Sequence, residues 1–92
     1  MIRVRWTTHA ADDLTRIVEY IRKDNPAAAQ RVARTIYRAV AELRTFPQRG
    51  RIGLASDTRE LIFSPLPYIA VYEIVDDQVN VLRIRHAAQD WP

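Results

Sequence analysis

The sequence contains no cysteine, so disulfides, thiolate catalysis and cysteine-ligated metal sites are excluded. It also has no apolar run near the roughly 18 residues that a membrane-spanning helix needs. The first ten residues, MIRVRWTTHA, lack a basic region followed by a long apolar stretch, so no signal peptide is expected. These absences predict a soluble protein with no membrane association, and a reducing cytoplasm fits the lack of cysteine. We expect neither a metal nor a cofactor.

The 92 residues are enough for one compact domain spanning 1–92, and too few for a second. Hydrophobic residues make up 48% and charged residues 27%, a balance typical of folded globular proteins. We find no internal repeat, no low-complexity segment and no linker.

Arginine dominates the charge of this chain. The formal net charge is +3, and only one of the 14 basic residues is a lysine. Guanidinium groups bind phosphates bidentately and stack on bases, which favours a nucleic-acid partner. Alternatively, the arginine content reflects a GC-rich genome, which enriches arginine in all of its proteins. Net charge indicates how a protein associates with other molecules and not how it folds.

The first half of the chain has the pattern of a strand followed by two helices. IRVRW alternates like a strand, and TTHAADD offers threonine caps, with Asp12 and Asp13 expected in the first turn of a helix. Asn25 and Pro26 suit the cap and the first position of a second helix. The apolar stripes are Leu14, Ile17, Val18 and Ile21 for the first helix, and Ala29, Val32, Ala33, Ile36, Val40 and Leu43 for the second.

The second half is predicted to form a meander of three strands, at 58–63, 68–75 and 79–86, after an irregular loop at 50–57. A tight turn at Asp76 and Asp77 joins the last two strands. The fold class is therefore α+β with the order βααβββ, an antiparallel helical hairpin packed on one face of a small, mainly antiparallel sheet.

The turn sets the expected strand register. It predicts the pairs Val75 with Gln78, Tyr72 with Val81, Ala70 with Arg83 and Tyr68 with Arg85. One face should then carry Arg59, Tyr68, Tyr72, Arg83 and Arg85, together with Leu61 and Phe63, which a partner would cover. The opposite face should pack on the helices through Ile62, Ile69, Val71, Leu82 and Ile84. Arginines beside tyrosines suit phosphates and unpaired bases, although such residues also occur simply as the solvent side of a sheet.

Several stretches resemble the RelE/ParE superfamily of bacterial toxins. They are the helix junction YIRKDNPAAAQRV, the exit FPQRGR and the C-terminal run RELIFSPLPYIAVYEIVDDQVNVLRIRHAAQDWP. The resemblance covers nearly the whole chain. It implies a toxin held inactive by a cognate antitoxin in a hetero-oligomer. Its target would be either ribosome-bound mRNA, which RelE-like members cut, or DNA gyrase, which ParE-like members poison; fold alone does not choose between them.

The resemblance also implies roles for particular residues. It places the basic loop of the family on Arg49 and Arg51, and its sheet arginines on Arg59 and on Arg83 or Arg85. In metal-independent RNA cleavage the ribose 2′-hydroxyl attacks the phosphate, which requires proton transfer and cations. His86 is the expected proton-transfer group, with Arg59 and Arg83 as catalytic cations, although a histidine at a strand end often serves only the structure.

The expected ligand-binding residues are Arg49, Arg51, Tyr68, Tyr72, Arg85 and Trp91. Trp91 stands where nuclease members often have a tyrosine, and it can stack on a base but cannot exchange a phenolic proton. Although the arginine-rich sheet and His86 slightly favour mRNA cleavage, the long helical hairpin with its DNPAAA junction resembles ParE-like members. A degenerate member that only binds its antitoxin is a third reading.

Overall fold

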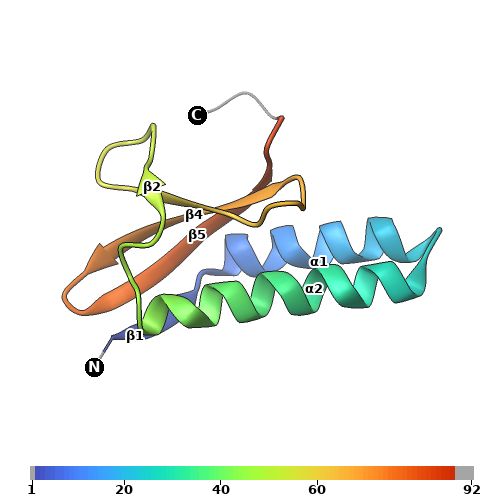
Figure 1. Ribbon diagram of the computed structural model, residues 1–92, viewed down its shortest axis with the longest axis horizontal. Coiled ribbons are helices and arrows are strands. Elements are labelled where there is room, and N and C mark those ends of the chain that lie inside the picture. Colours follow the sequence, from blue (N-terminus) through green and yellow to red (C-terminus); the bar gives the residue numbers. More distant parts are fainter. Residues whose placement is uncertain (1, 89–92) are drawn as a thin grey trace.

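The computed structural model describes residues 2–88, and over this range the chain forms two helices on one side of a five-stranded sheet (Figure 1). The elements are β1 (Arg3–Trp6), α1 (Thr8–Arg22), α2 (Pro26–Ala41), the short 3-10 helix η1 (Glu42–Arg44), β2 (Arg51–Ile52), β3 (Arg59–Ile62), β4 (Tyr68–Val75) and β5 (Gln78–His86). The predicted α+β class and the helical hairpin are confirmed. Within the described range, neither helix is long and apolar enough to cross a membrane.

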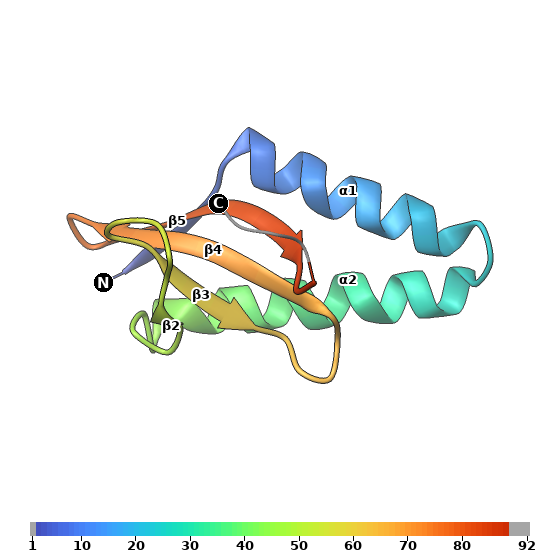
Figure 2. The same ribbon diagram turned by 90° about the horizontal axis from the view of Figure 1, so that it is seen from above.

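Both helices begin where their cap residues predict. The hydroxyl of Thr7 accepts the N–H of Ala10 at 3.2 Å, and the Asn25 side chain accepts the N–H of Ala28 at 3.0 Å. α1 and α2 run antiparallel, and their connecting turn extends beyond the end of the sheet (Figure 2). One expectation is wrong: the first turn of α1 contains no acidic residue, so Asp13 does not serve the helix dipole there.

The strand order is β1-β5-β4-β3-β2, with β1 parallel to β5 and the other pairs antiparallel. β2 falls inside the stretch predicted to be an irregular loop. It consists of two residues, Arg51 and Ile52, paired with Glu60 and Arg59. A strand of two residues is too short to show any periodicity, so the sequence pattern did not reveal it.

The hairpin of β4 and β5 begins in the predicted register and then leaves it. Asp76 and Asp77 have φ values of 49° and 60°, as a tight two-residue turn requires, and Val75 pairs with Gln78. The register shifts between Tyr72, which opposes Val81, and Val71, which opposes Arg83. Leu82 is the extra residue of this β-bulge. The predicted pairs of Ala70 with Arg83 and Tyr68 with Arg85 are therefore wrong: Ala70 opposes Ile84 and Tyr68 opposes His86.

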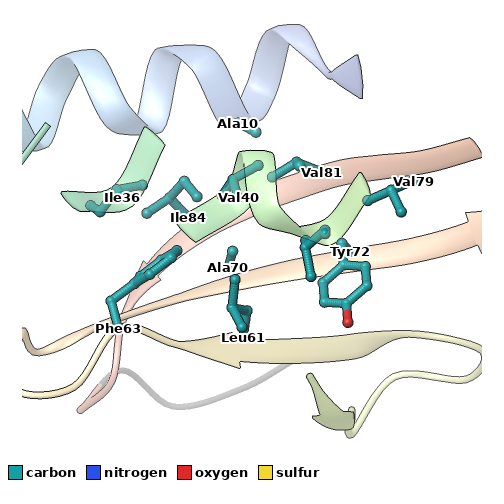
Figure 3. Packing of buried hydrophobic residues seen from close by; sticks show 11 residues of the cluster. Ala10, Ile36, Val40, Leu61, Phe63, Ala70, Tyr72, Val79, Val81 and Ile84 are labelled. Carbon is teal, nitrogen blue, oxygen red and sulfur yellow. The ribbon is translucent and has the colours of Figure 1, made fainter. Parts of the chain in front are cut away.

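The face of β3 and β4 that was predicted to be open is the one that packs on the helices, and the bulge makes Ile84, instead of Arg83, the partner of Ala70 there. Leu61, Phe63 and Tyr72 were predicted to be open to a ligand or partner, but they are 6%, 3% and 0% exposed and face the helices (Figure 3). The core cluster on this face consists of Ala10, Ile36, Val40, Leu43, Leu61, Phe63, Ala70, Tyr72, Val79, Val81 and Ile84. Arg83 opposes Val71, so it belongs to the other face of the sheet from Tyr72. Arg59 and Tyr72 share a face as predicted, but Arg83 and Arg85 do not belong to it.

Candidate functional site

Arg59 and Tyr72 together hold the loop that precedes β2. The buried hydroxyl of Tyr72 donates to the carbonyl of Pro47 at 2.6 Å and accepts the N–H of Gly50 at 2.9 Å. The Arg59 guanidinium donates to the carbonyl of Gly50 at 2.8 Å and to that of Gln48 at 3.3 Å. Burial raises the pKa of Tyr72, and the Gly50 N–H and the charge of Arg59 partly offset this rise. Both side chains therefore serve the loop, and a ligand has no access to the ring of Tyr72.

The two arginines of the loop also have partners within the chain. Arg49 lies 3.1 Å from Glu42 and stacks over the ring of Phe46, with 4.9 Å from its guanidinium carbon to the ring centroid. Arg51 donates from Nε to the buried carboxylate of Glu60 at 2.9 Å. Both guanidinium groups remain partly exposed. Their contacts with Glu42, Phe46 and Glu60 nevertheless mean that both arginines support the loop.

At the opposite end of the sheet, α1 replaces β1 as the neighbour of β5. β1 pairs with β5 only as far as Val81. There the N–H and the hydroxyl of Thr7 donate to the carbonyl of Val81 at 3.1 and 2.8 Å. Further along, the carboxylate of Asp13 accepts the backbone N–H of Ile84 at 3.0 Å. The open edge of β5 is thus satisfied by side chains of α1 and its cap, as buried backbone groups require.

Asp13 also gathers positive charge at this edge. It accepts hydrogen bonds from Nε and Nη2 of Arg83 at 2.8 and 3.1 Å, and one from Arg16 at 2.9 Å. Burial by itself would raise the pKa of Asp13, but the hydrogen bonds from Arg83, Ile84 and Arg16 outweigh it and hold this pKa below its usual value. The same pairing raises the pKa of Arg83. Asp13 is therefore an ionised anchor with its lone pairs occupied, and it is poorly suited to accept a proton in a reaction.

Beside this ion pair lies a groove of about 240 Å³ between α1 and the end of β5. We call it the basic groove; its lining residues are Asp13, Arg16, Ile17, Tyr68, Arg83, Ile84, Arg85 and His86. The rings of Tyr68 and His86 meet edge to face, with 5.5 Å between their centroids. His86 is exposed at the strand end, and its Nδ1 accepts the N–H of Ala88 at 3.1 Å.

The basic groove carries three guanidinium groups against one carboxylate. Burial lowers the pKa of Arg85, and the nearby charge of Arg83 lowers it further. An anion entering the groove would relieve this repulsion, so the site is electrostatically suited to a phosphate or a carboxylate. Among residues 2–88, no group of three or more His, Cys, Asp and Glu side chains is placed to hold a metal ion.

The structure brings together only some of the residues predicted to form the site. Tyr68, Arg83, Arg85 and His86 line the basic groove, whereas Arg49, Arg51, Arg59 and Tyr72 serve the loop at 47–51. Trp91 lies outside the described residues. Sequence reasoning missed Asp13 and Arg16, although a signal existed: Asp13 lies three residues after buried Ala10 and four before Ile17, on the apolar stripe. A carboxylate at such a position usually has a buried partner.

Solved bacterial toxins share this architecture. A chain of the structure "Chromosomal ParDE TA system from P. aeruginosa" superposes with a TM-score of 0.85 and 25% identity, over 94% of this chain and 96% of that chain. A copper-bound mutant toxin from Helicobacter pylori superposes with a TM-score of 0.64 and 18% identity, over 94% of each chain, a likeness of fold alone. The fold thus defines the class of small toxin domains of the RelE/ParE superfamily.

Sequence comparison gives the family itself. The family model described as the ParE toxin of the type II toxin-antitoxin system, parDE, matches residues 4–91. The chain therefore belongs to this family of toxins. It is 46% identical over 90 residues to Y4kP of Sinorhizobium fredii, named as a candidate toxin, which covers 98% of this chain and 93% of that protein. It is 44% identical over 89 residues to Toxin RelE2 of Caulobacter vibrioides, covering 97% of this chain and 99% of that protein.

Proposed function

We propose that this toxin acts by binding DNA gyrase, as ParE-like members do, and not by cutting mRNA. The observation that carries the proposal is the separation of Arg59 from the other two candidate catalytic residues, Arg83 and His86. Arg59 is bonded to loop carbonyls and belongs to the face of Tyr72, whereas Arg83 belongs to the other face and is paired with Asp13. Of the two expected catalytic cations, His86 therefore has only Arg83 beside it, and the guanidinium of Arg83 is already bound to Asp13.

The end of β2 and the connection from β2 to β3 point to a protein target as well. Two large aliphatic side chains are presented to solvent there: Ile52 is 75% and Leu54 76% exposed. Ile52 is paired with Arg59, and the loop that follows is closed by the N–H of Gly53, which donates to the carbonyl of Thr58 at 2.8 Å. Large aliphatic side chains presented on a hydrogen-bonded loop suit a protein surface better than a phosphate backbone.

Cleavage of ribosome-bound mRNA is the second candidate, and the basic groove is the observation that favours it. The groove joins His86 and Tyr68 to Arg83 and Arg85, which could hold a phosphate beside a group able to transfer a proton. The name of the Caulobacter relative, Toxin RelE2, agrees with this alternative.

Two assays on the purified toxin separate the candidates. Supercoiling and DNA cleavage by gyrase are measured with increasing toxin, and mRNA cleavage is measured on programmed ribosomes. The proposal predicts inhibited supercoiling with trapped cleaved DNA, and intact mRNA. Cleaved mRNA with unaffected gyrase would contradict it. In that case His86→Gln should lower cleavage roughly 10²- to 10⁴-fold, the usual worth of one general acid or base.

An antitoxin partner follows from the family, and the similar P. aeruginosa chain comes from a ParDE toxin-antitoxin system. We propose that a segment of the antitoxin folds onto the toxin to give a hetero-oligomer in the cytoplasm. Leu61 and Phe63 were expected to receive it, but both are buried in the core. Apolar surface is available instead in a groove between β1 and α2, lined in part by Ile2, Val4, Trp6 and Tyr37.

A further inference from the structure

The outer surface of α2 carries a row of three arginines, Arg31, Arg34 and Arg38, which we call the arginine ridge. Their spacing of i, i+3 and i+7 places them along one side of the helix. All three are exposed, and the buried residues of the helix, Ala29, Ile36 and Val40, define the opposite side. We propose that the arginine ridge binds the phosphate backbone of duplex DNA.

The charge of the ridge is not neutralised within the described part of the chain. α2 contains no acidic residue, and the ion pairs seen over residues 2–88 are formed by other arginines. The acidic residue that directly follows α2, Glu42, is held by Arg49 at 3.1 Å. In α1, which packs beside α2, Glu19 is paired with Arg22. The ridge therefore presents a positive field to an external anion.

The dimensions of the ridge suit a regular polyanion. Seven residues of helix span about 10 Å at about 1.5 Å per residue. Duplex DNA carries one negative charge per roughly 1.7 Å of its axis, so a ridge of this length lies opposite several phosphates. Guanidinium forks bind phosphate oxygens bidentately, and such contacts do not depend on base sequence.

An acidic protein segment fits the ridge less well. A segment that folds on binding must bury apolar area to offset its ordering, and the ridge is interspersed with small or polar residues such as Thr35. The apolar area lies on the flank of α2, where Trp6 stacks on Tyr37 with 6.3 Å between the ring centroids. The inference goes beyond the proposed gyrase target, because the contact is with DNA itself and requires no gyrase.

The test uses the full chain and a short labelled duplex, with binding followed by fluorescence anisotropy between about 50 and 200 mM salt. The ridge variant carries Arg31→Gln, Arg34→Gln and Arg38→Gln. The control variant carries Arg3→Gln, Arg5→Gln and Lys23→Gln, at exposed positions on β1 and at the end of α1. Each variant loses three positive charges from a formal net charge of +3, so the two have equal net charge.

The ridge variant should bind the duplex roughly 10- to 100-fold more weakly near 0.1 M salt, and the slope of log K against log salt should become shallower by about 2 to 3. The control variant should stay close to wild type in DNA affinity, both variants should keep the wild-type circular dichroism, and the ridge variant should keep the wild-type antitoxin affinity. Absence of DNA binding by the wild type, or equal loss in both variants, would overturn the inference. So would loss of antitoxin binding by the ridge variant, which would assign the ridge to that partner.

The result of the gyrase assay does not depend on the result of the DNA-binding assay. Ridge-dependent DNA binding without gyrase inhibition would remove the proposed function and leave the DNA contact. Gyrase inhibition with equal DNA affinity in wild type and ridge variant would support the proposed function and remove the DNA contact of the ridge.

Discussion

The carboxylate of Asp13 in α1 and the guanidinium of Arg83 in β5 form two hydrogen bonds, of 2.8 and 3.1 Å, across 70 residues of sequence. Because the same carboxylate accepts the N–H of Ile84, it joins the helix to the sheet at the edge that β1 leaves open. Asp13 is 6% exposed and Arg83 36% exposed, so the pair has one buried and one partly solvated member. The contact both closes the β5 edge and orients one arginine of the basic groove.

Replacing Asp13 by alanine should destabilise the fold by about 3 kcal/mol. The change removes the partner of the Ile84 N–H, and leaving a buried donor unsatisfied costs about 1–3 kcal/mol. It also leaves Arg83 and Arg16 without their carboxylate. Urea unfolding followed by circular dichroism measures the loss. Asp12→Ala, at the exposed neighbouring position, is the control and should change stability by less than about 0.5 kcal/mol; equal effects would show that the Asp13 contacts contribute little.

The pKa of Asp13 predicts a pH dependence of stability. This pKa is lowered below 3.8 in the folded state, so well above pH 3.8, from about pH 5 upward, the carboxylate is ionised in both states and its contribution is complete. As the pH falls through 3.8 the unfolded chain binds a proton first, and stability declines until the folded carboxyl is protonated as well. Unfolding free energies from pH 7 to pH 2 should fall more steeply for wild type than for Asp13→Asn. Parallel curves would mean that Asp13 does not titrate differently in the two states.

Tyr72→Phe should cost about 1–3 kcal/mol, because it leaves the buried Gly50 N–H without its acceptor and the Pro47 carbonyl without its donor. Hydrogen exchange at the Gly50 amide should accelerate as the loop loosens. Tyr20→Phe, at a ring that is 74% exposed, is the control and should change neither quantity. Since the ring of Tyr72 is buried, toxicity at low temperature should survive; its complete loss in a folded variant would restore a ligand-binding role to this hydroxyl.

Arg59 and Arg83 should contribute to stability independently. They belong to opposite faces of the sheet and have different partners, the carbonyls of the 48–50 loop and Asp13. In a double-mutant cycle with Arg59→Gln and Arg83→Gln, the coupling energy should be below about 0.5 kcal/mol. A larger coupling would indicate that the two arginines act on a common group, as the nuclease mechanism requires.

The sequence by itself determined the elements that depend on near neighbours. Thr7 and Asn25 cap the two helices, the apolar stripes face the core, and β4 spans 68–75 as predicted. These signals are local, because caps, helical periodicity and tight turns involve residues only a few positions apart. The same is true of the turn at Asp76 and Asp77, which places Val75 opposite Gln78.

Tertiary structure alone decided which side chains share the candidate site. One extra residue, Leu82, moves Arg83 to the face of the sheet that does not carry Tyr72. It also makes His86 the cross-strand partner of Tyr68. No local pattern marks this bulge, yet a shift of one residue changes the face of every side chain beyond it. Likewise, β1 pairing ends at Val81, and only the packing of α1 against the exposed remainder of β5 brings Asp13 to Arg83. The backbone groups at that open edge need hydrogen-bond partners, and the elements that leave the edge open are distant from Asp13 in sequence. Asp13, which the sequence alone suggests to be a surface residue, is therefore buried as a partner of this edge.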